Sequence, residues 1–183
     1  AVGSIPNTQG LGLEAAGVRA VFHDTVDGEP EAGYMDSCAA ACTGAKCDLV
    51  VSIGGGSVID TGKIAAIMAS HPGPVADYQM GRKEFSLPAL PHVAVPTTAG
   101  TGAEATKVAV VTNKKAGIKK SIGHPSLIPR TVILDPELTR NLPSRLTLLV
   151  GLDALSHAME SHVSPNASPF TEAYSARAVE LIR

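Results

Sequence analysis

The sequence has few aromatic residues and no concentration of positive charge. Tryptophan is absent, aromatic residues make up 3% of the chain, and the net charge is −2 with no basic block. Nucleic acids are bound through clustered Lys and Arg and, when single-stranded, through stacked aromatic rings, so both absences argue against a nucleic-acid partner. No apolar run approaches the ~20 residues of a membrane-spanning helix. The N-terminus also lacks the basic and apolar regions of a signal peptide, so we expect a cytoplasmic protein with no membrane partner.

Cysteine is scarce, and its count is odd. The three cysteines are Cys38, Cys42 and Cys47, and the first two lie one helical turn apart. An odd number in a chain without a secretion signal argues for free thiols. A metal cluster would need a fourth ligand, and the nearest histidine in sequence, His23, precedes a turn. We therefore interpret the three as structural thiols that behave as small hydrophobic residues.

The remaining composition suits a packed core, because 44% of the 183 residues are hydrophobic and 17% are charged. Strand-like apolar runs lie at residues 18–22, 49–53, 92–95, 107–112, 118–122 and 131–134, and helical patterns at 34–43 and 58–68. After Pro143 the pattern is helical to the end. Strands that alternate with helices, followed by helices alone, predict an α/β domain over 1–142 and the start of an all-helical domain over 143–183.

The most informative stretch is DLVVSIGGGSVIDTGK, from Asp48 to Lys63. A short β-branched strand runs into three glycines, and Ser57 then stands where it can cap a helix. The free N–H groups and partial positive charge of a helix start suit a phosphate. The stretch fails the Walker A pattern, and Ile59 breaks the strict dinucleotide pattern GxGxxG. A structural tight turn and a nucleotide phosphate site therefore both remain open.

A second loop of this kind, PTTAGTGAE, follows the strand at 92–95. Its threonine hydroxyls and backbone N–H groups can bind phosphate or ribose oxygens, although a plain connecting loop has the same composition. Ligands of open α/β sheets bind beyond the carboxyl ends of the strands, so two such loops strengthen each other. Lys119 or Lys120 could reach a phosphate, but exposed lysines are also common on edge strands.

Asp153 and His157 stand four residues apart in the predicted helical region. This spacing places a carboxylate and an imidazole on one face of a helix, where they can chelate a divalent metal. Such a pair is more often a hydrogen bond on a helix surface. Two ligands are also too few for a catalytic zinc, which takes three from the protein.

Four motifs, GGGSVIDTGK, PTTAGTGAEAT, LDPEL and GLDALSHAMESHVSP, occur in an order and at separations that resemble the iron-containing (group III) alcohol dehydrogenases. The resemblance runs from about Leu11 to the last residue. It implies a Rossmann-like NAD(P)-binding domain before an all-helical domain. It also implies hydride transfer between NAD or NADP and a small alcohol or aldehyde, assisted by a metal that is usually Fe²⁺ and sometimes Zn²⁺.

The resemblance also implies roles for single residues. Gly55, Gly56 and Ser57 would hold the cofactor pyrophosphate. Thr97, Thr98 and Thr101 would line the phosphate, the ribose and the nicotinamide end of the cofactor. Lys119 would contact the ribose, and Leu134 would lie beside the cofactor. Asp153 and His157 match the first two metal ligands.

The chain departs from the family at several points. The family has two further histidine ligands downstream, and the sequence ends at Arg183 before them. A family Asn-Pro-Thr loop near the cofactor reads Glu29-Pro30-Glu31 here. An inactive nucleotide-binding fragment of the family is therefore the alternative expectation. A third is a structural or partner-binding piece whose exposed apolar face drives association, for example into a homodimer.

Overall fold

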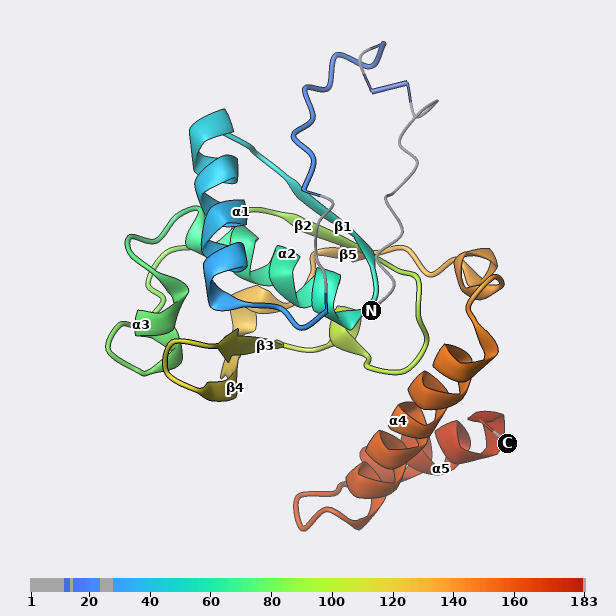
Figure 1. Ribbon diagram of the computed structural model, residues 1–183. Coiled ribbons are helices and arrows are strands. Elements are labelled where there is room, and N and C mark those ends of the chain that lie inside the picture. Colours follow the sequence, from blue (N-terminus) through green and yellow to red (C-terminus); the bar gives the residue numbers. More distant parts are fainter. Residues whose placement is uncertain (1–11, 14, 24–27, 183) are drawn as a thin grey trace. The chain divides into compact units, whose positions relative to one another are not determined.

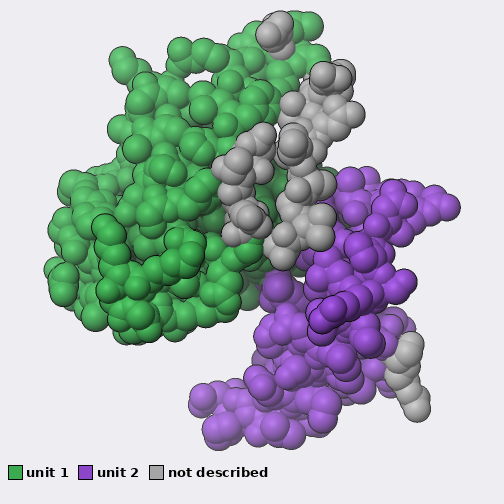
Figure 2. Space-filling view, viewed as in Figure 1, with its two compact units in different colours: residues 1–96, 103–134 green, residues 97–102, 135–183 purple. Residues whose placement is uncertain are grey.

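The computed structural model describes residues 12–13, 15–23 and 28–182. The chain divides into two compact units, which Figure 2 colours green for residues 1–96 and 103–134 and purple for residues 97–102 and 135–183. The first unit is α/β and the second is helical, which confirms the predicted fold class. The domain boundary expected at residue 142 stays a prediction.

The first unit contains a three-stranded parallel sheet (Figure 1). Its strands are β1 (Val50–Gly54), β2 (His92–Pro96) and β5 (Thr131–Val132), in the order β1-β2-β5. The register of β1 and β2 runs from Val50 opposite His92 to Gly54 opposite Pro96. Parallel neighbours need a crossover, and the chain between β1 and β2 supplies one with two helices.

The first crossover helix, α2 (Gly56–Met68), is buried at every position from Ile59 onward. It lies between the sheet and an antiparallel hairpin of β3 (Val108–Asn113) and β4 (Ile118–Gly123) (Figure 1). A helix that is covered on all sides must be apolar on every face, or its polar side chains must form hydrogen bonds inside the protein. The isoleucines and alanines of α2 meet this requirement. The helix α2 therefore packs against the sheet on one face and against the hairpin on another.

The helices α1 (Ala32–Ala45) and α3 (Val75–Gln79) complete the first unit. Its main core joins buried side chains of α1, α2 and α3 to the hairpin and to Leu127, which follows the hairpin in the chain. The members are Ala32, Met35, Ala39, Ile64, Ile67, Met68, Val75, Tyr78, Ala109, Val111, Ile122 and Leu127. The two-stranded hairpin could not bury its apolar face alone, so α2 and α3 supply the other side of that core.

The second unit contains two long helices, α4 (Ser144–Val163) and α5 (Pro169–Ile182). They are joined by a hydrogen bond of 2.9 Å between His162 Nδ1 and Ser175 Oγ. Many of their apolar side chains are exposed: Leu148, Leu149, Leu152, Met159, Val163, Phe170, Tyr174 and Leu181. An apolar surface of this kind is expected of helices that pack against further partners.

Two local predictions are wrong. Residues 18–22 form no strand, and Val18, Val21 and Phe22 are each about half exposed. An alternating pattern yields a strand only where a neighbour pairs with it, and no strand of the described residues does so here. Ser57 does not cap α2, because the helix already begins at Gly56 and Gly55 occupies the N-cap without a side-chain hydrogen bond. The expectations for residues 1–11 lie outside the described residues.

Among the described residues, no helix is long and apolar enough to cross a membrane. A cytoplasmic location stays a prediction.

We predict that Gly62→Ala destabilises the α/β unit. A Cβ at this position would lie 1.8 Å from Ser52 Oγ and 2.9 Å from His92 Nε2, because α2 packs closely on β1 and β2. Overpacking of this kind costs about 1–3 kcal/mol, and the loss is measurable as a lower free energy of unfolding in urea.

The matched control is Gly44→Ala in α1, where a Cβ would meet nothing within 4 Å. That change should raise stability by up to about 1 kcal/mol through helix propensity. Adding Ser52→Ala to Gly62→Ala should recover part of the loss. If Gly62→Ala were as stabilising as the control, the close approach of α2 to the sheet would not be a constraint.

Candidate functional site

Three of the predicted site segments leave the parallel sheet at the same edge. Gly54 ends β1 opposite Pro96, which ends β2. The residue that follows each strand begins a predicted cofactor-binding segment: Gly55 follows β1, and Thr97 follows β2. The register of β2 with β5, Ala94 opposite Val132, brings the chain after β5 to this edge as well. The carboxyl edge of a parallel sheet is where ligands of this fold class bind.

The glycine turn exposes the start of α2. Gly55 is extended, with φ −78° and ψ −175°, and its carbonyl accepts from the N–H groups of Val58 at 3.0 Å and Ile59 at 3.1 Å. The preceding N–H groups, of Gly56 and Ser57, have no acceptor inside the helix, and no side chain caps them. These donors and the helix dipole form an arrangement suited to an anion such as a diphosphate.

Packing of the first turn of α2 requires a glycine at position 54. A Cβ at Gly54 would lie 2.7 Å from two atoms of the Val58 side chain, so the first turn of α2 folds directly over it. Any larger residue would push that turn away from the end of β1. The tightness of the turn therefore fixes where the helix N-terminus lies.

The threonine loop belongs to the helical unit. Residues 97–102 group with residues 135–183, and a Cβ at Gly100 would lie 2.5 Å from the carbonyl oxygen of Val150 in α4. Thr97 and Thr98 are half-buried, whereas Thr101 is exposed. Since Val150 lies one helical turn before Asp153, the loop approaches the same stretch of α4 that carries the Asp–His pair.

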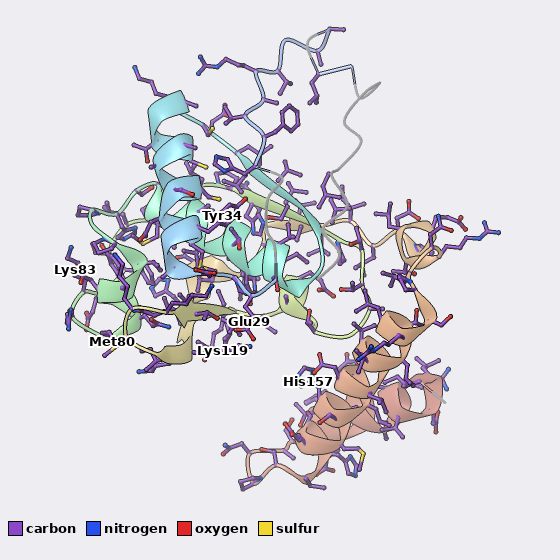
Figure 3. The ribbon with its side chains drawn as sticks, viewed as in Figure 1. Glu29, Tyr34, Met80, Lys83, Lys119 and His157 are labelled. Atoms are coloured by element: carbon purple, nitrogen blue, oxygen red, sulfur yellow. The ribbon has the colours of Figure 1, made fainter. Side chains whose placement is uncertain are left out.

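Lys119 lies on β4 and forms an ion pair with Glu29, with 2.6 Å between Nζ and Oε1 (Figure 3). Glu29 also accepts from Thr112 Oγ1 at 3.0 Å. Hydrogen bonds from Lys119 and then from Thr112 lower the pKa of the Glu29 carboxyl. Both partners are more than half exposed, so the pair is accessible to a ligand. Leu134, two residues beyond β5, is 71% exposed.

Asp153 and His157 face each other on α4, as their spacing predicts. Asp153 Oδ1 and His157 Nε2 are 3.8 Å apart, and both side chains are about half exposed. Because bonds from Zn²⁺ to such atoms are about 2.0–2.2 Å long, one ion can touch both. Nowhere in residues 12–13, 15–23 and 28–182 do three or more His, Cys, Asp or Glu gather into a group that could hold a metal. His162, bound to Ser175, takes no part in this pair.

A buried polar network beneath the glycine turn was not predicted from the sequence. Lys63 is 1% exposed, and its Nζ donates to Val108 O at 2.7 Å and Thr106 Oγ1 at 3.1 Å. Asp60 Oδ1 lies 3.5 Å from Lys63 Nζ, an ion-pair distance, and Asp60 Oδ2 accepts from Val110 N at 2.9 Å. Burial lowers the pKa of Lys63 and raises the pKa of Asp60. The i, i+3 spacing of an acid and a base was the available signal.

His92 extends the polar interior on the other side of α2. Its Nε2 lies 2.9 Å from Ser52 Oγ, and the residue is 4% exposed. Burial, and next the charge of Lys63, lower the pKa of His92 to about 4. The imidazole is therefore neutral at physiological pH and acts as a hydrogen-bonding member of the core.

Comparison with known proteins decides the family. A family model described as iron-containing alcohol dehydrogenase matches residues 9–136. The chain belongs to this family. Long-chain-alcohol dehydrogenase 1 of Geobacillus thermodenitrificans (strain NG80-2) is 39% identical to this chain over 164 residues. The NAD-dependent methanol dehydrogenase of Bacillus methanolicus is 43% identical over 136 residues. The first match covers 88% of this chain and the second 74%.

The structure agrees with this assignment. Sulfoacetaldehyde reductase from Bifidobacterium kashiwanohense, solved in complex with NAD⁺, is 38% identical with a TM-score of 0.86, over 90% of this chain and 44% of that one. The NADH-dependent butanol dehydrogenase A of Thermotoga maritima is 28% identical with a TM-score of 0.85, over 93% and 42%. The chain spans only 41% and 35% of the two curated members named above.

We predict that His92 makes stability fall on acidification. An unfolded histidine titrates near 6.5, whereas the folded pKa is about 4, so the unfolded chain binds the extra proton between these values. The contribution of His92 is complete above pH 6.5 and is lost as the pH falls toward 4. The expected loss is on the order of 3 kcal/mol, measured by urea unfolding at several pH values.

His92→Gln is the control, because an amide can still bond to Ser52 but does not titrate. The difference between the two pH profiles removes the contributions of the other groups. Parallel profiles for the two proteins would show that His92 is not the titrating residue.

Proposed function

We propose that this chain supplies the dinucleotide site and part of the metal site of an oxidoreductase. The reaction is hydride transfer between an alcohol and its aldehyde or ketone. The observation that carries the proposal is the shared edge at which Gly54 and Pro96 end paired strands. Family membership gives the chemistry, and small alcohols or aldehydes are the substrate class.

The diphosphate is assigned to Gly55, Gly56 and Ser57. Support comes from the uncapped start of α2, whose first N–H groups have no intrahelical acceptor. Gly54 and Gly62 hold the helix close to the sheet, so the donors are fixed before a ligand arrives. Preorganised donors of this kind cost little entropy on binding.

The remaining cofactor contacts follow from the second loop and the hairpin. Thr97, Thr98 and Thr101 supply hydroxyl groups for phosphate, ribose and the nicotinamide end, and Leu134 supplies an exposed apolar surface for a ring. Lys119 serves the ribose, and to do so it must share its ammonium with Glu29. NAD is the preferred cofactor, with NADP as the alternative, because relatives named above use NAD or NADH.

The metal is assigned to Asp153 and His157. One carboxylate oxygen and one imidazole nitrogen form a donor set that suits Fe²⁺ and also Zn²⁺. When bound, the dinucleotide supplies hydride chemistry and the divalent metal supplies Lewis acidity. The proximity of Gly100 to Val150 supports a common role for the threonine loop and this stretch of α4.

A catalytically inactive nucleotide-binding piece is the second candidate. It is favoured by one observation: in the part of the chain that the structure describes, no third His, Cys, Asp or Glu joins Asp153 and His157 in a metal-binding group. An NAD⁺ assay with Fe²⁺ and small primary alcohols separates the two candidates. Formation of NADH supports the oxidoreductase, and NAD⁺ binding without turnover supports the inactive piece. Assembly into a homodimer stays a prediction.

We predict that Gly56→Asp weakens NAD⁺ binding at least about tenfold without destabilising the fold. An acidic residue in the first turn stabilises a helix through its dipole, yet it repels a diphosphate at the same place. Calorimetric titration with NAD⁺ and a thermal melt measure the two effects. Gly56→Asn, of the same size but uncharged, should lose much less affinity. Equal losses in the two variants would remove the diphosphate from this turn.

We predict that the chain binds Zn²⁺ weakly through α4 and releases it on dialysis, since two ligands are fewer than a tight site uses. Asp153→Asn and His157→Ala should each reduce the calorimetric signal by at least about tenfold. His162→Ala is the matched control on the same helix, because His162 bonds to Ser175 instead. A signal that persists in the first two variants would place the metal elsewhere.

A further inference from the structure

The end of α1 brings two cysteines together. Lys46 has φ 54° and ψ 49°, which reverses the chain just beyond the helix. Its N–H donates to Thr43 O at 3.1 Å, and Cys47 N–H donates to Cys42 O at 2.9 Å. These two bonds define a Schellman motif. In this motif the side chains at the positions of Cys42 and Cys47 typically touch, and a hydrophobic pair usually occupies them.

The geometry distinguishes this pair from the other cysteines. A disulfide needs Cβ atoms about 3.5–4.5 Å apart, whereas helical residues four apart have Cβ atoms about 5–6 Å apart. Cys38 and Cys42 both lie inside α1 and so cannot bond without distorting the helix. Cys47 lies after the chain reversal, and its direct backbone hydrogen bond to Cys42 brings the two residues within reach of each other.

Both thiols are accessible from one groove. Cys42 and Cys47 are half-buried, whereas Cys38 is 5% exposed. The groove has a volume of about 650 Å³ and is lined by all three cysteines and by β1. Burial, and next the neighbouring thiols of Cys47 and Cys38, raise the pKa of Cys42 to about 11. Cys42 is therefore mostly protonated at neutral pH.

We propose that Cys42 and Cys47 form a paired dithiol that low-molecular-weight disulfides, such as oxidised glutathione, convert into an internal disulfide. Nothing in the proposed dehydrogenase chemistry uses these residues.

The exchange proceeds in two balanced steps. The Cys47 thiolate attacks one sulfur of the reagent, which breaks the reagent's S–S bond and releases one thiol. The Cys42 thiolate then attacks the Cys47 sulfur, which forms the internal bond and releases the second thiol. The two cysteine protons end on the two released thiols. The pair loses two electrons and the reagent gains them.

The disulfide would fix the connection between α1 and β1. Residues 46–49 join the end of the helix to the strand whose far end carries the glycine turn. Because the ring closed by residues 42–47 is short, little stabilisation is expected from chain entropy. The expected effect is therefore a chemical modification that leaves the fold intact.

The sequence provides a sharp test of the pairing. Trypsin cleaves after Arg19, Lys46 and Lys63, so Cys42 falls in peptide 20–46 and Cys47 in peptide 47–63. The full chain is treated with oxidised glutathione, free thiols are alkylated, and the monomer is isolated on a non-reducing gel and digested. We expect the two peptides to be joined until a reductant is added. A disulfide between Cys38 and Cys42 would instead remain inside peptide 20–46.

The variants make the assignment specific. Cys38→Ala should retain the joined peptides, whereas Cys42→Ala and Cys47→Ala should reduce them by at least about tenfold. A circular dichroism spectrum of each variant confirms its fold, and joined peptides in Cys38→Ala exclude a bond between Cys38 and Cys47. Only mixed disulfides with glutathione, or only a bond that involves Cys38, would overturn the proposal.

Discussion

The packing of α2 against both β1 and the β3–β4 hairpin is the constraint on which the α/β unit depends. Toward the sheet, the absence of a side chain at Gly62 lets the helix backbone approach Ser52 and His92. Toward the hairpin, Lys63 and Asp60 bond to the backbone of β3 at Val108 and Val110. A buried ion pair is costly to desolvate, and this one is retained where it also satisfies backbone groups. The helix is thus fixed from two sides at adjacent positions.

This constraint reaches the candidate site directly. The same helix begins at the glycine turn, so whatever holds Asp60, Gly62 and Lys63 also holds the N–H groups at residues 56–57. Lys63 could be mistaken for a phosphate-binding lysine because it follows a glycine-rich stretch. Its ammonium is instead bound to Val108 O and Thr106 Oγ1 inside the unit. The proposed anion site therefore relies on backbone donors and the helix dipole rather than on a side-chain charge.

Strong local patterns made most of the fold predictable. The β-branched runs predicted β1 and β2 within one residue. The burial expected of the first run is wrong, because β1 ends the described sheet and only Ser52 within it is buried. The run at Val18–Phe22 failed because strand formation depends on a neighbour, which the local sequence does not report. Ser57 failed as a cap because Gly55 can adopt the extended N-cap conformation, which leaves Ser57 inside the helix. The pairing of His92 with Ser52 joins residues 40 apart, and only the register of β1 and β2 reveals it.

The candidate site combines rigid elements with one residue, Lys119, for which a ligand would have to compete with Glu29. The glycine turn is preorganised, and the Asp153–His157 spacing follows from helix geometry, so both could be read from the sequence. Lys119 is different, because its partner Glu29 lies 90 residues away in the chain. A ligand that recruits Lys119 must compete with a carboxylate at 2.6 Å. Since the pair is more than half exposed, that competition costs little, and Glu29 can itself accept hydrogen bonds from ribose hydroxyl groups. Glu29 therefore changes the charge offered to a ligand of Lys119 without blocking access to it.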